Sequence, residues 1–155
     1  MYKKIMVPLD GSELAECVLP HVEALATGFS LKEVILVRVV EPEEIPAYRV
    51  EGNLLSQVTL ERESTRKSSA EDYLARVGTR LKREAAALHS EVLVGRVSES
   101  LVDYAEQKEV DLIVIATHGR SGVTRWVRGS VADKILRSAN VPVLMVRAPG
   151  TKGGI

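Results

Sequence analysis

The stretch Asp111-Leu-Ile-Val-Ile-Ala-Thr117 is the most apolar in the chain and decides the fold class. A strand that is apolar at nearly every position is typical of a parallel sheet buried on both faces. The stretch Val34-Ile-Leu-Val-Arg-Val-Val40 has the same character. Shorter apolar runs at 5–9, 91–95 and 141–146 are three further predicted strands.

A helical pattern follows the first predicted strand. Apolar residues recur at spacings of three and four from Leu14 to Phe29, as on one face of a helix. Ser12 is a suitable N-cap, and Gly28 can end the helix. Pro20 lies inside the pattern, where we expect it to kink the helix because it removes a hydrogen bond.

A longer helix is predicted after a loop at 41–55 that contains two prolines and a glycine. Its first half, 56–69, is polar, and we expect this half to project or fray. Its second half carries one apolar face, made of Ala70, Leu74, Val77, Leu81, Ala85 and Leu88.

Two further helices complete the alternation of strand and helix. Ser98 is predicted to cap a helix that runs to about Lys108, and Ser130 with Asp133 has the form of a capping box. Five strands alternating with four helices predict an α/β fold with a doubly wound parallel sheet, covered on both faces.

Composition narrows the class of protein. A length of 155 residues fits one domain, and we assign 1–147 to it and 148–155 to a loose tail. The formal net charge is zero and aromatic residues make up 4%, which argues against a nucleic-acid-binding protein. The longest apolar stretches are about five residues, far below the ~20 that span a bilayer. We therefore expect a cytoplasmic protein without membrane contact.

Two strand ends carry residues that suit a ligand. Asp10-Gly11-Ser12 follows the first strand, and a segment with glycines and arginines, 116–130, follows the fourth. Ligands of such sheets bind beyond the carboxyl ends of the strands, where the strand order reverses. The region 118–137 holds five basic residues and one acidic residue, so its charge is +4. Gly129-Ser130 opens a helix, where free N–H groups favour phosphate, although an ordinary turn and N-cap would have the same residues.

The chain resembles the universal stress protein family, in its UspA-like single-domain form, from Tyr2 to Arg147. The nucleotide-binding branch of that family carries Gly-x-x-Gly, nine residues, and then Gly-Ser or Gly-Thr. Here the motif reads Ala116-Thr-His-Gly119, nine residues, and then Gly129-Ser130, so that Ala116 replaces the first glycine. The resemblance implies a three-layer α/β/α fold with strand order 3-2-1-4-5.

The resemblance also implies a ligand, which is ATP or another adenine nucleotide with Mg²⁺ or another divalent ion, provided that the methyl group of Ala116 is tolerated. A metal would be held by Asp10 only indirectly, together with nucleotide. The family pattern places the following residues along the nucleotide: Pro8, Asp10, Val39, Ile115, Ala116, Gly119, Gly129, Ser130 and Val131. The alternative role of Asp10 is to cap its own turn.

The resemblance further implies a homodimer joined through the strand at 141–146. Three functions stay open. The first is an ATP- or AMP-binding regulatory module of the stress response with an unknown protein partner. The second is a nucleotide-independent dimeric interaction protein, which Ala116 favours. The third and least favoured is a slow ATPase, because no general base is evident apart from Asp10 or His118, and we therefore expect nucleotide binding without efficient turnover.

Overall fold

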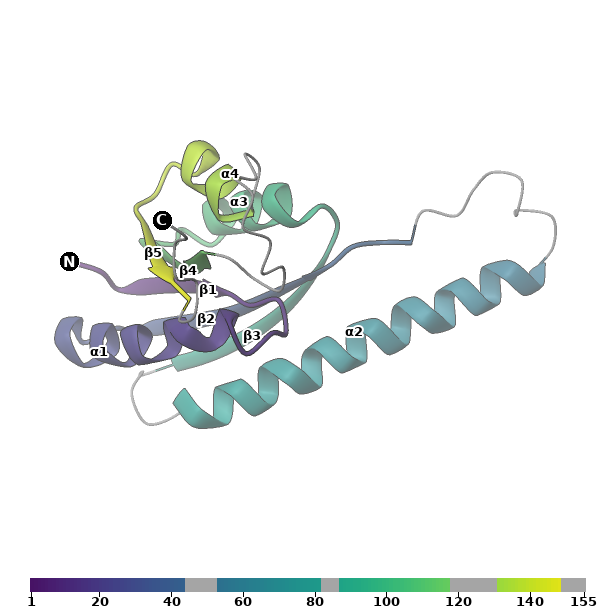
Figure 1. The fold of residues 1–155 in the computed structure, drawn as a ribbon, viewed down its shortest axis with the longest axis horizontal. Coiled ribbons are helices and arrows are strands. Elements are labelled where there is room, and N and C mark those ends of the chain that lie inside the picture. The colour runs from purple at the N-terminus through teal and green to yellow at the C-terminus, as the bar shows by residue number, and fades with distance from the viewer. Residues whose placement is uncertain (44–52, 82–86, 118–130, 149–155) are drawn as a thin grey trace, which may run out of the picture.

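A computed structural model of the chain describes residues 1–43, 53–81, 87–117 and 131–148. The described residues form a parallel five-stranded sheet with the order β3-β2-β1-β4-β5, which confirms the expected fold class and strand order (Figure 1). The strands are β1 (Lys4–Pro8), β2 (Glu33–Val40), β3 (Ala87–Val94), β4 (Leu112–Thr117) and β5 (Val143–Arg147).

Helices cover both faces of this sheet, as Figure 1 shows. One face carries α1 and α2, and the other carries α3 and α4. The helices are η1 (Ala15–Val18, a 3₁₀ turn), α1 (Leu19–Phe29), α2 (Asn53–Leu81), α3 (Val97–Gln107) and α4 (Val131–Ser138). The two cores are separate because successive side chains of a strand point to opposite faces. In β2, Leu36 packs toward α1 and α2, whereas Ile35 and Val37 pack toward α3 and α4.

The strands β1 and β4 are paired over only part of their length. The pairing of β1 with β2 continues to the end of β1, where Pro8 lies opposite Val37. The pairing of β1 with β4 stops at Met6 and Ile113, although β4 continues to Thr117. The strands β1 and β4 therefore separate toward their carboxyl ends, at the point where the strand order reverses.

The first helix differs from the expected kinked helix. A 3₁₀ turn precedes α1, and Pro20 is the second residue of α1. No hydrogen bond is lost there because the first N–H groups of a helix have no partner inside it. The prediction of a kink was therefore wrong, and so was the end at Gly28. The helix ends at Phe29, and its C-cap is Ser30, which has a left-handed backbone with φ +50°.

Two other boundaries differ from the predicted ones. Strand β3 begins at Ala87 rather than at 91, so Leu88 lies in a strand and not on the long helix. Helix α3 begins at Val97, and Ser98 is not its N-cap. The N-cap position is occupied by Arg96, which makes no capping hydrogen bond through its side chain.

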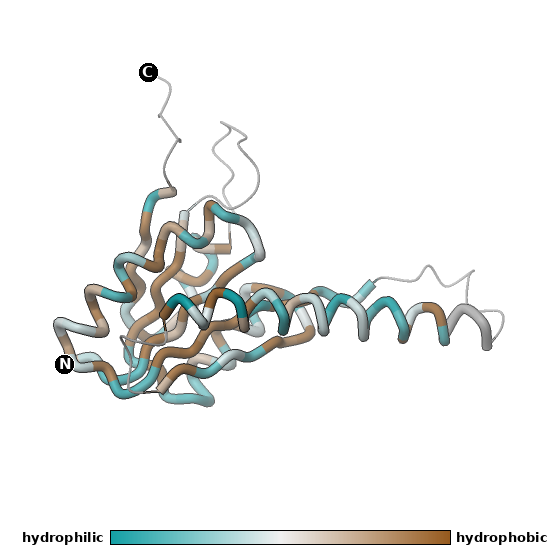
Figure 2. The backbone as a smooth tube through the Cα atoms, turned by 90° about the horizontal axis from the view of Figure 1, so that it is seen from below, coloured by the Kyte–Doolittle hydropathy of each residue, from teal (hydrophilic) through white to brown (hydrophobic). Residues whose placement is uncertain are grey.

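Helix α2 extends well beyond the sheet. It has 29 residues, which at 1.5 Å per residue gives about 43 Å. Its fully buried side chains begin at Ala70 and end at Leu81. The half before Ala70 runs out past the body of the molecule and is mostly hydrophilic, which confirms the expected projection (Figures 1 and 2).

Candidate functional site

Four of the predicted site residues lie along the carboxyl edge of the three central strands. Pro8 is the last residue of β1, Val39 is near the end of β2, and Ile115 and Ala116 are near the end of β4. Pro8 and Ile115 are buried, whereas Val39 and Ala116 are half-buried. Because parallel strands end at one edge, the fold brings these residues to the place where β1 and β4 separate.

The side chains at this edge face in two directions. Val39 and Ile115 belong to the core under α3 and α4. Ala116 packs against the core under α1 and α2, and its backbone lies opposite Val146 of β5. The methyl group of Ala116 is therefore accommodated by protein contacts on that face of the sheet.

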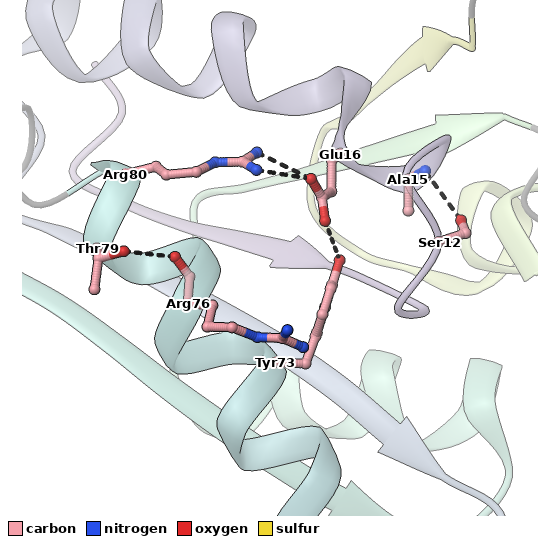
Figure 3. Close-up of polar contacts among 7 residues, drawn as sticks. All are labelled: Ser12, Ala15, Glu16, Tyr73, Arg76, Thr79 and Arg80. Atoms are coloured by element: carbon pink, nitrogen blue, oxygen red, sulfur yellow. Dashed lines mark hydrogen bonds and ion pairs between the residues drawn. The ribbon is translucent and has the colours of Figure 1, made fainter.

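The turn after β1 is held by its own side chains. Oδ1 of Asp10 accepts hydrogen bonds from the backbone N–H of Ser12, at 2.8 Å, and from the Ser12 hydroxyl, at 2.5 Å. The Ser12 Oγ atom in turn accepts one from the N–H of Ala15, at 3.2 Å, at the start of η1 (Figure 3). Asp10 is exposed, and its second oxygen, Oδ2, takes no hydrogen bond from the described residues. Asp10 thus shapes its turn with Oδ1, while Oδ2 is available to a ligand.

Sequence reasoning missed an arginine beside this turn. Arg38 of β2 lies against Gly11, whose φ of +86° suits only glycine well. A Cβ atom added to Gly11 would lie 2.9 Å from Cζ of Arg38. The guanidinium group also lies over the ring of Tyr73 from α2, 5.3 Å from its centroid. A signal was available, since Arg38 is the one charged residue inside the apolar stretch 34–40.

A glutamate links this region to α2. Oε1 of Glu16 accepts the hydroxyl hydrogen bond of Tyr73 at 3.1 Å, and Oε2 accepts two from the guanidinium of Arg80, both at 3.0 Å (Figure 3). Burial of Tyr73, followed by the negative charge of Glu16, raises the pKa of the phenol well above its ordinary value. Tyr73 therefore stays protonated and keeps donating to Glu16.

The rest of the predicted site lies partly outside the described residues, which do not include Gly119, Gly129 and Ser130. Val131 is the first residue of α4 and is half-buried. No group of three metal-ligating side chains occurs in the described ranges. A single carboxylate such as Asp10 suits Mg²⁺ only when phosphate oxygens and water supply the other ligands. The described residues therefore offer one carboxylate, which could bind such a cation only together with phosphate oxygens and water.

Comparison with known proteins gives the family. The model of the universal stress protein family matches residues 1–147, and the chain belongs to this family. It is 32% identical to universal stress protein MJ0531 of Methanocaldococcus jannaschii over 151 residues, covering 96% of this chain and 84% of the relative. It is also 32% identical to universal stress protein MJ0577 of the same organism, covering 95% of this chain and 96% of the relative.

Solved structures agree with the fold. The structure of MJ0577 superposes with a TM-score of 0.82 at 30% identity, covering 97% of this chain and 99% of that one. Three fold neighbours were solved with nucleotides, which are cAMP in a universal stress protein (TM-score 0.70, 20% identity), dAMP in one from Archaeoglobus fulgidus (0.60, 23%) and AMP in one from Arabidopsis thaliana (0.60, 12%). They cover 95%, 93% and 97% of this chain and 98%, 97% and 94% of their own. Within the described ranges, no helix is both long and apolar enough to cross a membrane.

Proposed function

We propose that this chain is an adenine-nucleotide-binding regulatory protein of the stress response, acting in the cytoplasm through one domain at 1–147 with a tail at 148–155. The observation that carries the proposal is the separation of β1 from β4 beside the exposed Asp10. That separation lies where ligands bind in doubly wound sheets. The proposal is also supported by the neighbours of the same fold that hold cAMP, dAMP or AMP.

The proposed ligand is ATP or AMP, lying along the carboxyl edge of the sheet. The backbone of Val39 would face the adenine, and Asp10 would lie beside the ribose or a metal–phosphate group. Ile115 and Ala116 would lie along the nucleotide. Phosphate would be held by backbone N–H groups of Gly119, Gly129, Ser130 and Val131 and by the Ser130 hydroxyl. Mg²⁺ would enter with a triphosphate, because a carboxylate next to phosphates repels them unless a cation intervenes.

Isothermal titration calorimetry tests this proposal with ATP, AMP and cAMP as ligands, each in Mg²⁺ and in EDTA. Asp10→Asn keeps the oxygen that shapes the turn but removes the charge. Compared with the parent chain, we expect this variant to lose more affinity for Mg²⁺-ATP than for ATP in EDTA. Asp103→Asn on the exposed face of α3 is the matched control and should leave both affinities unchanged. Absence of binding heat for all three nucleotides at millimolar concentration would contradict the proposal.

The second candidate function is that of a nucleotide-independent interaction protein. The observation that favours it is Ala116, which stands where the nucleotide-binding branch has glycine. Ala116→Gly separates the two functions. Equal binding by the parent chain and by this variant supports the nucleotide function, whereas binding by the variant alone supports the second. The proposal includes no efficient hydrolysis, so phosphate release from ATP should stay near the rate without protein.

We also propose that two copies pair through β5. This strand is an edge of the sheet in the described ranges, and Leu144 is 36% exposed on it. An apolar strand edge with unpaired backbone groups is a template for pairing with a second chain. Sedimentation equilibrium should give twice the chain mass, and Leu144→Lys should shift the chain toward the monomer. A parent chain that sediments as a monomer would contradict this part.

A further inference from the structure

A hollow of about 270 Å³ lies between the base of the projecting half of α2 and the ends of β2 and β3. Its floor is made by Val40 and Val94, which are paired neighbours on the two strands. Both side chains point to the face that α2 covers, in step with Leu36 and Val92 of that core. Leu60 lines the hollow from the helix. None of the described residues proposed to contact nucleotide lines it, so the hollow is a separate feature.

The hollow exists because the sheet-facing stripe of α2 changes character along the helix. In the packed half this stripe is apolar and includes Leu74, which is fully buried. About two to three turns earlier, the same stripe carries Lys67 and Ser64, which line the hollow without filling it with apolar atoms. The apolar side chains around them stay open to water, so that Val94 is 59% exposed and Leu60 is 64% exposed.

The hollow adjoins a free edge of the sheet. Among the described residues β3 is an edge strand, and its last residue, Val94, is part of the floor. The outer backbone groups of an edge strand can pair with an extended segment of another chain, and every second side chain of that segment then points to one face. Sites for small molecules usually measure ~300–1,000 Å³, so this smaller hollow suits one or two side chains of a peptide better than a cofactor.

Charged groups surround the apolar floor. The carboxylates of Glu41 and Glu63 and the ammonium group of Lys67 line the hollow, which gives it a net charge of −1. None of these three makes an ion pair with another residue of the described ranges, whereas Glu43 nearby is paired with Arg62 at 3.9 Å. Glu63 is also half-buried, so its charge is screened less by water and salt. Charge complementarity therefore favours an occupant with a basic residue beside its apolar one.

We propose that the edge of β3 and this hollow form a docking site for an extended peptide segment of a partner protein. The segment extends the sheet by one strand and carries an apolar and a basic side chain two residues apart, on the same face. The apolar side chain lies against Val40, Val94 and Leu60, and the basic one lies beside Glu41 or Glu63. The site does not depend on nucleotide, so a failure of the proposed function leaves it standing.

Titration of two synthetic peptides, followed by the amide NMR shifts of the full chain without nucleotide, tests the proposal. The probe is acetylated Thr-Val-Thr-Leu-Thr-Lys-Thr amide, in which valine, leucine and lysine share one face of a strand. The control peptide is Thr-Val-Thr-Leu-Lys-Thr-Thr, which has the same composition but places leucine and lysine on opposite faces. We expect saturable shifts along β3 and at Leu60 with the probe, and binding of the control peptide that is about fivefold or more weaker.

Variants of the hollow locate the bound peptide. Val94→Lys should weaken probe binding about tenfold or more, because it fills the floor and repels the lysine of the probe, while edge strands tolerate lysine. Leu136→Lys is the matched control. It adds the same charge to an apolar residue that is 50% exposed on α4, across the sheet, and should bind the probe as the parent does. Glu63→Gln should reduce the preference for the probe over a peptide with glutamine in place of lysine.

Several results would overturn the docking site. These are an absence of shifts at millimolar probe, equal binding of the two peptides, and equal binding of the probe by Val94→Lys and the parent chain. If Val94→Lys lowers the mass measured by sedimentation equilibrium and Leu136→Lys does not, the occupant is a second copy of this chain and the peptide proposal is wrong. If Val94→Lys does not fold, Leu60→Ala replaces it, since this residue is mostly exposed, and it should weaken probe binding severalfold.

Discussion

The two halves of α2 are one continuous helix in opposite surroundings. From Ala70 to Leu81 the helix presses an apolar stripe onto β2 and β3, and Ala70 and Leu74 have no exposed surface. Before Ala70 the same helix lies beyond the sheet, and Leu60 is 64% exposed. The packed half should therefore carry most of the contribution of α2 to folding, because tertiary burial stabilises most helices in proteins.

The difference also decides where the helix can take part in the site. Tyr73 and Arg80, which both bind Glu16 of η1, belong to the packed half. The projecting half contacts the body at its base, where Arg62 lies 3.9 Å from Glu43, an exposed pair of little energetic weight. Changes in the packed half should thus affect stability and nucleotide binding together, and changes in the projecting half should affect neither.

Proline substitution should give the largest difference in stability between the two halves of α2. Arg76→Pro, at an exposed position of the packed half, should destabilise the protein by about 3 kcal/mol or more, since it removes a helical hydrogen bond and moves the packed stripe. Thr65→Pro, also exposed, should lower the helical circular dichroism but leave the urea midpoint nearly unchanged. Equal losses of stability would show that the projecting half is part of the cooperative unit.

A pair of leucine truncations should have the next largest effect. Leu74→Ala removes a side chain that is fully buried between α2 and the sheet, and it should cost about 2–5 kcal/mol. Leu60→Ala makes the same chemical change on the projecting half, where little area is buried, and should stay within about 0.5 kcal/mol. Urea unfolding of both variants measures the difference. A cost above 2 kcal/mol for Leu60→Ala would mean that this side chain is covered in solution.

Loss of one hydroxyl group should give the smallest effect. Tyr73→Phe removes the hydrogen bond to Glu16 and should destabilise the protein by about 0.5–1.5 kcal/mol. Tyr104→Phe is the control, because its hydroxyl donates to no described residue and this tyrosine belongs to α3, on the other face of the sheet. Thermal unfolding of the two variants side by side checks the prediction. If both variants unfold at the same temperature, the link through Glu16 contributes nothing to stability.

Local patterns predicted most of the fold. The five apolar runs correspond to the five strands, and the polar start of the long helix correctly indicated a projecting arm. The errors came where a local pattern has two readings. Leu88 continues the helical spacing of α2, yet it lies in β3. The error arose because an edge strand that packs under a helix carries the same apolar residue types as the helix face that covers it. Pro20 fits the start of a helix as well as a kink, and the preceding 3₁₀ turn decided between them.

The candidate site was predictable only in part. Asp10 could be singled out because it follows a strand at the edge where ligands bind, and a role in its own turn was the stated alternative, which the hydrogen bonds to Ser12 bear out. The companions of Asp10 could not be found in this way. Arg38 and Tyr73 are separated by 35 positions in the sequence, and only the crossover from β2 through α2 places the ring beneath the guanidinium.

By itself, the sequence determined the alternation of strands and helices, the class of sheet and the two strand ends that could hold a ligand. These properties follow from the spacing of apolar residues, which burial in a layered fold imposes locally. The tertiary structure alone decided that β1 and β4 separate after Met6 and that Arg38 lies against Gly11. Such contacts depend on how far each strand runs and on which helix covers it, and no local pattern contains that information.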